Sequence, residues 1–137
     1  MIEITQQPIS PESVVSKVKT DSSGCVVTYI GLIREYSRRR PVFSVEYEDV
    51  QGTAKSRLRE IASELRQKWQ LNNIAICHRI GKLEVGDINL VVAVAAAHRR
   101  EGFAACRYAI NQFKQKLPTH KQETYQDGSI SVEGNAI

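Results

Sequence analysis

The segment Ile88–Ala96, INLVVAVAA, constrains the fold of this chain more than any other segment. It is nearly all apolar, and it is far too short to cross a membrane as a helix. Such a run is typical of a central strand that is covered on both faces. Apolar residues at helical spacing follow it, among them Phe103, Ile110 and Phe113, until Pro118 ends the helix. The two segments together predict a sheet with a layer on each side.

Other segments give weaker but readable signals. Residues 53–69 carry apolar positions at helical spacing, and Ser10 can cap a helix that has Pro11 in its first position. Asp127-Gly128 marks a tight hairpin. Residues 34–41 are interpreted as a charged loop. Further strands are predicted at residues 2–5, 25–33, 42–48 and 74–80, and a frayed tail at residues 133–137.

This order of elements predicts the fold class. Strands outnumber helices and a hairpin is present, so we expect an α+β domain with about three helices and a mixed, mostly antiparallel sheet. The length of 137 residues and the hydrophobic content of 42% fit one domain over residues 1–137 with a single core.

Charge and termini narrow the classes of partner. The net charge of +4 favours anionic partners such as phosphates, acidic protein surfaces or nucleic acid. The only dense basic cluster, Arg38-Arg39-Arg40, is too short to establish nucleic-acid binding and fits a solvated loop. The N-terminus lacks the features of a signal peptide, and no apolar run is long enough to span a membrane. We therefore expect a cytoplasmic protein with no membrane partner.

The cysteines do not indicate a metal site. Cys25, Cys77 and Cys106 are far apart and show no metal-ligand spacing. Each lies in an apolar pattern, so each is interpreted as a small buried hydrophobic residue in a reducing compartment.

The start of the helix after the apolar run carries an unusual set of cations. His98, Arg99 and Arg100 lie where the strand gives way to the helix. The peptide dipoles leave partial positive charge at a helix N-terminus, so cations are disfavoured there. No Ser, Thr, Asp or Asn directly precedes the helix to bond its free N–H groups. This helix start would suit an anion, above all a phosphate, and a solvated basic start with a weak cap is the alternative.

Two lysines near the far end of that helix are the main chemical candidates. Lys114 follows Phe113 at the margin of the predicted core, and the Pro118 turn can aim Lys121 toward the same pocket. At that margin Lys114 can lose water, which would lower its pKa and let it act as acid, base or nucleophile. Both could instead be surface lysines. His78 alternates with isoleucines and is interpreted as a hydrogen-bonded core histidine.

Five short motifs form a more specific pattern as a set. They are GCVVTYIGLIRE from Gly24, VEYE from Val45, ICHRIGKLEVGD from Ile76, AHRREGF from Ala97 and KQKLPTHKQE from Lys114. In this order and spacing, the chain resembles the MoaE family, the large catalytic subunit of molybdopterin synthase, over about residues 20–133.

The resemblance implies a fold, an activity and partners. The fold is of the α/β-hammerhead type, and the assembly is a homodimer within a heterotetramer that has one small ubiquitin-like MoaD subunit at each end. The implied activity is that of a sulfurtransferase, which converts precursor Z, cyclic pyranopterin monophosphate, to molybdopterin by inserting two sulfurs. The sulfur comes from the thiocarboxylate at the Gly-Gly C-terminus of the small subunit, whose tail enters a pocket of the large one. No metal and no cofactor are implied.

The resemblance also assigns roles to single residues. Lys114 is the implied principal catalytic lysine, engaging the thiocarboxylate tail or moving protons, and Lys121 assists it. Phosphate and pterin oxygens would be held by cationic side chains, in a pocket that family members complete across the dimer. The implied substrate-binding residues are Leu32, Ile33, Arg34, His98, Arg99, Gln122 and Glu123.

Three positions depart from the family pattern. His120 stands where an aromatic residue is common, Gln122 where a basic residue is usual, and Leu32 where the residue is often polar or basic. These departures predict a less cationic pocket. They keep open a second hypothesis, a family-like scaffold that binds the ubiquitin-like partner or a phosphorylated ligand with little catalysis. Nucleic-acid binding through Arg38-Arg39-Arg40 is a third and weaker hypothesis.

Overall fold

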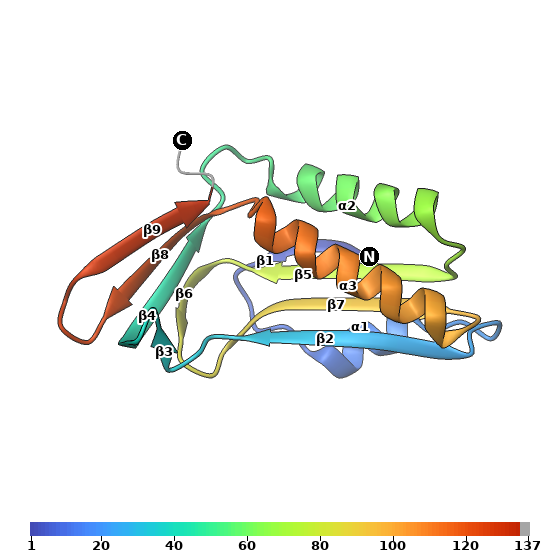
Figure 1. Ribbon diagram of the computed structural model, residues 1–137, viewed down its shortest axis with the longest axis horizontal. Coiled ribbons are helices and arrows are strands. Elements are labelled where there is room, and N and C mark those ends of the chain that lie inside the picture. Colours follow the sequence, from blue (N-terminus) through green and yellow to red (C-terminus); the bar gives the residue numbers. More distant parts are fainter. Residues whose placement is uncertain (135–137) are drawn as a thin grey trace.

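The computed structural model describes residues 1–134, which form two β-sheets placed one after the other along the molecule (Figure 1). The first sheet has the order β1-β5-β7-β2, and only the pair β1 and β5 is parallel. The second has the order β3-β4-β8-β9, and β6 also pairs with β4. The strands are β1 (Ile2–Thr5), β2 (Cys25–Leu32), β3 (Tyr36–Ser37), β4 (Arg40–Glu48), β5 (Asn73–Arg79), β6 (Gly81–Glu84), β7 (Ile88–Ala96), β8 (His120–Tyr125) and β9 (Ile130–Gly134).

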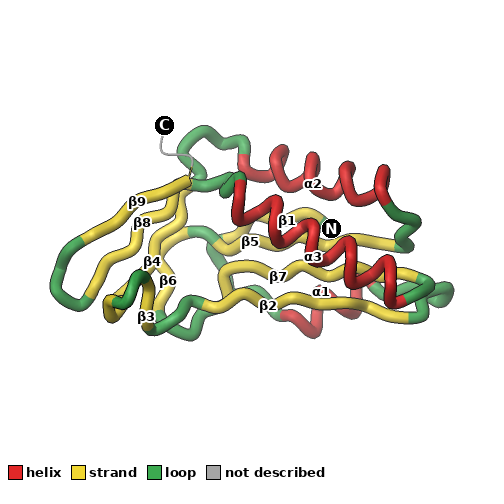
Figure 2. The backbone as a smooth tube through the Cα atoms, in the orientation of Figure 1, coloured by secondary structure: helices red, strands yellow, loops and turns green. Residues whose placement is uncertain are grey.

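All three helices within the described residues pack on the first sheet, as the colouring of Figure 2 makes clear. Helix α1 (Pro11–Val18) covers one face, and α2 (Ala54–Lys68) and α3 (Arg99–Gln115) cover the other. The α+β class with three helices and mixed, mostly antiparallel sheets is thereby confirmed.

The predicted central strand is confirmed residue for residue as β7. Successive side chains of a strand point to opposite faces, so one strand can serve two layers. Leu90, Val92 and Val94 pack in the core that α2 and α3 share. Val91 and Ala93 pack under α1 on the other face.

The helix starts follow the sequence signals. Ser10 caps α1, its side chain accepting a hydrogen bond from the backbone N–H of Ser13 at 3.2 Å. Helix α3 starts after His98, and no side chain caps it, as predicted. Its first turn therefore presents free N–H groups together with exposed cations.

Three parts of the sequence-based interpretation were wrong. The predicted charged loop contains β3 and the first residues of β4, joined by a tight turn in which Arg38 and Arg39 have φ of 53° and 63°. The connection after Gly81 forms β6, which pairs with β4. Strand β6 depends on a partner distant in sequence, which a local pattern does not reveal, and β3 is only two residues long and turns at non-glycine residues. Glu133 and Gly134, which were assigned to a frayed tail, lie in β9, and the last three residues of that tail lie outside the described residues.

Candidate active site

The main cleft lies where the end of β2 and the last turn of α3 meet β4 and β8 of the second sheet. Its volume is about 520 Å³. Six of the residues assigned by resemblance line it, namely Leu32, Ile33, Arg34, Lys114, Lys121 and Glu123.

Local structure explains why these side chains converge. Lys114 lies in the last turn of α3, one residue after Phe113, whose ring is buried in the core and fixes that turn. Lys121 and Glu123 are two apart on β8, so both point to the same face of the strand. Arg34 follows β2 directly after the buried Ile33. Lys114 and Lys121 line the same cleft, as expected.

The electrostatic state of Lys121 is set by two neighbouring carboxylates. Its ammonium group lies 3.2 Å from a carboxylate oxygen of Glu133 and 3.9 Å from one of Glu123. Burial alone would lower the pKa of Lys121, but Tyr47 and the carboxylates of Glu123 and Glu133 outweigh it, and the pKa is raised. Lys121 therefore stays an ammonium ion at neutral pH.

Lys114 and Arg34 differ from Lys121 in their exposure and in their lack of an ion-pair partner among residues 1–134. Both side chains are exposed, so the loss of water expected at Lys114 does not occur in this chain, and that hypothesis is wrong. Neither makes an ion pair with any residue of the range 1–134. The cleft thus offers two unpaired cations at its surface and one paired cation at its wall, an arrangement suited to an anionic ligand.

Glu123 is held as a fixed carboxylate in the wall of the cleft. It is buried, and its Oε1 accepts hydrogen bonds from Ser37 Oγ at 3.0 Å and from the Tyr125 hydroxyl at 3.1 Å. Ser37 belongs to β3, so this carboxylate ties the β3–β4 hairpin to β8. Its second oxygen faces Lys121.

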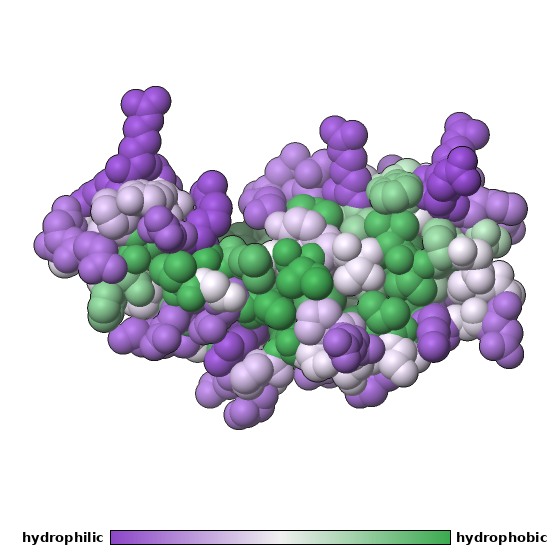
Figure 3. Space-filling view, turned by 90° about the horizontal axis from the view of Figure 1, so that it is seen from below, coloured by the Kyte–Doolittle hydropathy of each residue, from purple (hydrophilic) through white to green (hydrophobic). Residues whose placement is uncertain are grey.

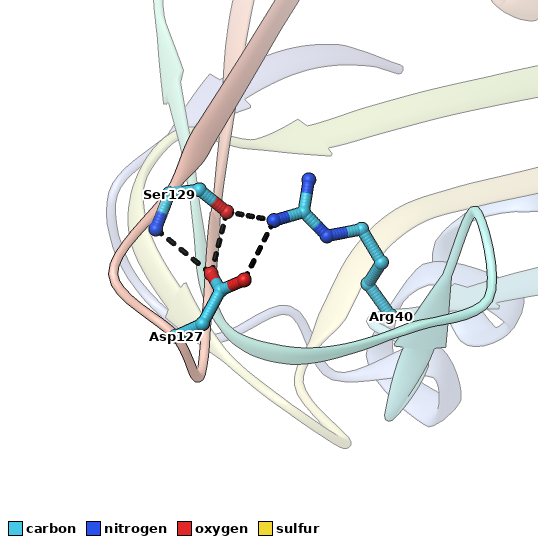
Figure 4. Close-up of polar contacts among 3 residues, drawn as sticks. All are labelled: Arg40, Asp127 and Ser129. Atoms are coloured by element: carbon cyan, nitrogen blue, oxygen red, sulfur yellow. Dashed lines mark hydrogen bonds and ion pairs between the residues drawn. The ribbon is translucent and has the colours of Figure 1, made fainter.

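A second anchor holds the same hairpin, as Figure 4 shows. Arg40 pairs with Asp127 at 2.8 Å and donates to Ser129, and its guanidinium lies 4.2 Å from the centre of the Tyr125 ring. Hydrogen bonds from Ser129 and then from Arg40 lower the pKa of Asp127. Arg40 is thus engaged in structure, and the basic triplet does not present three free cations to a nucleic acid.

His98 and Arg99 lie at the other end of α3. A rise of roughly 1.5 Å per residue puts Arg99 about 22 Å from Lys114 along the helix axis. His98 borders a separate hollow of about 330 Å³, which Trp69 and Glu101 also line. Within one chain, therefore, the predicted cationic residues form two groups and not one pocket.

Gln122 also lies apart from the cleft. It alternates with Lys121 and Glu123 on β8 and opposes Glu46 and Val132 in the sheet. Strand geometry directs it to the opposite face.

Sequence analysis missed several polar residues of the cleft, among them Tyr47 and Asn89. The Asn89 amide donates a hydrogen bond to the Tyr47 hydroxyl at 3.1 Å. Burial raises the pKa of Tyr47, so the phenol keeps its proton and can donate a hydrogen bond. A polar residue inside the apolar run Ile88–Ala96 was the signal available for Asn89.

The interpretation of His78 as a core histidine is confirmed. Its side chain is fully buried and hydrogen-bonded at both ring nitrogens. No group of acidic, cysteine or histidine side chains in residues 1–134 is arranged to hold a metal ion. Of the helices described, none is long and apolar enough to traverse a bilayer.

Comparison with known proteins places this geometry in a family. A model of the MoaE protein family matches residues 4–116, a range that includes Arg34, His98 and Lys114 and ends before Lys121. The chain belongs to the MoaE family.

Individual MoaE relatives agree with that assignment. The chain is 40% identical over 127 residues to the molybdopterin synthase catalytic subunit of Nostoc, covering 92% of this chain and 77% of the relative. It is 37% identical over 126 residues to the subunit of that name from Bacillus subtilis, covering 92% and 80%. The crystal structure of molybdopterin synthase from Staphylococcus aureus superposes with a TM-score of 0.89 at 31% identity, over 98% of this chain and 97% of that one.

Proposed function

We propose that this chain is the catalytic subunit of a molybdopterin synthase. In this role it is a sulfurtransferase that converts precursor Z to molybdopterin with sulfur from a thiocarboxylated MoaD partner. The observation that carries the proposal is the cleft of a MoaE-family chain, in which Arg34, Lys114 and Lys121 converge. Its three unpaired cysteines suit a reducing cytoplasm.

The charges of the cleft fit both reactants, because each is an anion. The phosphate of the pterin suits the exposed guanidinium of Arg34, which can bind it through two donors. The thiocarboxylate suits Lys114, whose ammonium group is exposed and has no ion pair among residues 1–134. Lys121, held as a cation by Glu123 and Glu133, supplies fixed positive charge beside the reacting groups.

We further propose that a second copy of the chain completes the site. Strand β2 is an edge strand, and Ile30, Leu32 and Phe103 are exposed along it and on the adjoining α3. Figure 3 shows apolar side chains gathered along this side of the molecule. A contiguous apolar surface beside a cleft is typical of a protein contact. In the dimer, each cleft would contain Lys114 of one chain together with His98 and Arg99 of the other chain. Within one chain these residues are too far apart to share a cleft.

The departures from the family pattern do not weaken the proposal. Gln122 and, by the same alternation, His120 belong to the face of β8 opposite Lys121. Their side chains leave the cations of the cleft unchanged. Of the three departures, only Leu32 lines the cleft, where its side chain is exposed. It is the one departure that still favours the hypothesis of a scaffold with little catalysis.

Reconstitution tests the proposed activity directly. The purified chain is mixed with a thiocarboxylated ubiquitin-like partner and precursor Z, and molybdopterin is quantified by fluorescence after oxidation. We expect conversion in a single turnover that depends on the thiocarboxylate, because the same partner with a plain carboxylate has no sulfur to give. Complex formation on gel filtration without conversion would support the scaffold hypothesis instead.

A complementation experiment tests the shared site. Chains carrying His98→Ala and chains carrying Lys114→Ala are each expected to be inactive in the same assay. When they are co-expressed, a mixed dimer has one site with both substitutions and one with neither. With random pairing we expect about a quarter of the wild-type activity to return. No recovery in a mixture shown to contain mixed dimers would place the whole site within one chain.

A further inference from the structure

A buried imidazole, that of His78, contacts residues of β4, β7 and α3 and the link that leads into β8. The side chain of His78, on β5, is fully buried. Its Nδ1 lies 2.9 Å from the backbone oxygen of Asn89, and its Nε2 lies 2.9 Å from Thr119 Oγ1. Neither bond is to a charged group.

The chemistry of the partners fixes the direction of both hydrogen bonds. A backbone carbonyl can only accept, so Nδ1 carries the proton that is donated to Asn89. Nε2 is then the acceptor, and the Thr119 hydroxyl must donate to it. Burial lowers the pKa of His78 to about 4, against smaller opposing effects of the Asn89 bond and of Asp49, so the ring is neutral at physiological pH. The hydrogen bond between Thr119 and His78 therefore has one direction, with the Thr119 hydroxyl as the donor and Nε2 of His78 as the acceptor.

The ring also contacts the neighbours of both lysines. Its centroid lies 4.9 Å from that of Phe113, which directly precedes Lys114, and 4.8 Å from that of Tyr47, which lines the cleft. Thr119 precedes Lys121 by two residues and is fully buried. His78 therefore bridges the end of α3 and the start of β8.

The segment between these two ends is short and needs an anchor. Helix α3 ends at Gln115 and β8 begins at His120, so Thr119 is the last residue of the link. On its other side, the backbone of β9 approaches closely, because a Cβ on Gly134 would overlap the Thr119 carbonyl oxygen. Thr119 is thus held by backbone packing on one side and by the imidazole on the other.

We propose that His78 and Thr119 are positioning residues that set the placement of Lys121 relative to Lys114 in the cleft. The proposal deepens the proposed function, on which the importance of the two lysines rests. The pair touches no reactant. It acts through the link: a displacement of Thr119 would shift Lys121 at the start of β8 and so change the distances from its ammonium group to the carboxylates of Glu123 and Glu133.

A matched pair of variants tests this role. Thr119→Val keeps the shape of the side chain but removes the donor, and Thr119→Ser keeps the donor. The pKa of Lys121 is measured in each free chain by NMR titration of lysine labelled at the ε-carbon, with Lys121→Arg used to assign the signal. We expect the pKa of Lys121 to fall toward its ordinary value in Thr119→Val and to stay at the wild-type value in Thr119→Ser. Should Thr119→Val not fold, Thr119→Ala removes the same hydroxyl without placing a methyl group against the ring.

Equal pKa values of Lys121 in the wild type and in the folded variant without the hydroxyl would overturn the proposal, even if that variant were less stable. In the reconstituted reaction we expect kcat to fall about tenfold in Thr119→Val with little change in KM. An equal loss of kcat in Thr119→Ser would also overturn it. The NMR measurement needs neither partner nor substrate, so it decides the role of His78 and Thr119 even if the chain transfers no sulfur.

Discussion

Replacing Lys114 by alanine is expected to reduce sulfur transfer by at least about a hundredfold, the scale on which positioned acid–base groups act. Lys114 is an exposed cation of the cleft without an ion-pair partner in the described part of the chain, so its charge is available to the thiocarboxylate. Arg34 and Lys121 remain and keep part of the affinity for anions. We therefore expect the loss in the rate constant of conversion, measured in a single turnover, and no change in the melting temperature.

Lys116→Ala is the matched control for this experiment. Lys116 follows α3 directly and is exposed, but it borders a different hollow beside α2 and not the cleft. Its removal changes the net charge by the same amount and should leave turnover at the wild-type level. Wild-type turnover by Lys114→Ala would remove this lysine from the mechanism, and an equal loss in both variants would indicate a general effect of charge.

The sequence best predicted those helices and strands whose conformation is determined by residues close in the sequence. The apolar run of β7, the amphipathic stripe of α2 and the cap at Ser10 each depend on neighbours within a few residues, and all three were confirmed. Strand β6 was missed because it pairs with β4, which is far away in the sequence, whereas β3 is a two-residue strand that pairs with the start of β4 across a turn with no glycine to mark it. Strand alternation also explains why Gln122 and Lys121 face opposite ways although they are adjacent.

The cleft itself was predictable only in part. The convergence of Lys114 and Lys121 followed from the turn that Pro118 imposes after α3, but the charge state of Lys121 did not. Glu133 approaches from β9, which pairs with β8 in antiparallel register, and its carboxylate raises the pKa of Lys121. The sequence predicted a hairpin at Asp127-Gly128 but did not show which residue of its second strand lies beside Lys121. The separation of His98 from Lys114, by contrast, follows from the length of one helix.

Acid is expected to destabilise the folded chain through His78, beginning near pH 6.5. A histidine in the unfolded chain takes up a proton near its ordinary pKa of 6.5, whereas the buried ring does so only near pH 4. Between these values the unfolded state binds more protons, so the free energy of unfolding falls as the pH falls. The interval corresponds to about 3 kcal/mol, because each pH unit within it is worth about 1.4 kcal/mol for one proton. Below about pH 4 both states are protonated and this contribution stops changing.

Urea unfolding at a series of pH values, compared between the wild type and His78→Gln, isolates this effect. Carboxylates also titrate in the lower part of the range, but they do so in both proteins and cancel in the comparison. Glutamine has no titrating ring, and its amide can still bond to Thr119, so His78→Gln should be less stable at pH 7 and lose less stability on acidification. We expect the two curves of unfolding free energy against pH to converge by about 3 kcal/mol between pH 6.5 and pH 4. Parallel curves would show that the imidazole takes up its proton equally well in the folded and unfolded chain, and would contradict the assignment of a neutral, buried ring.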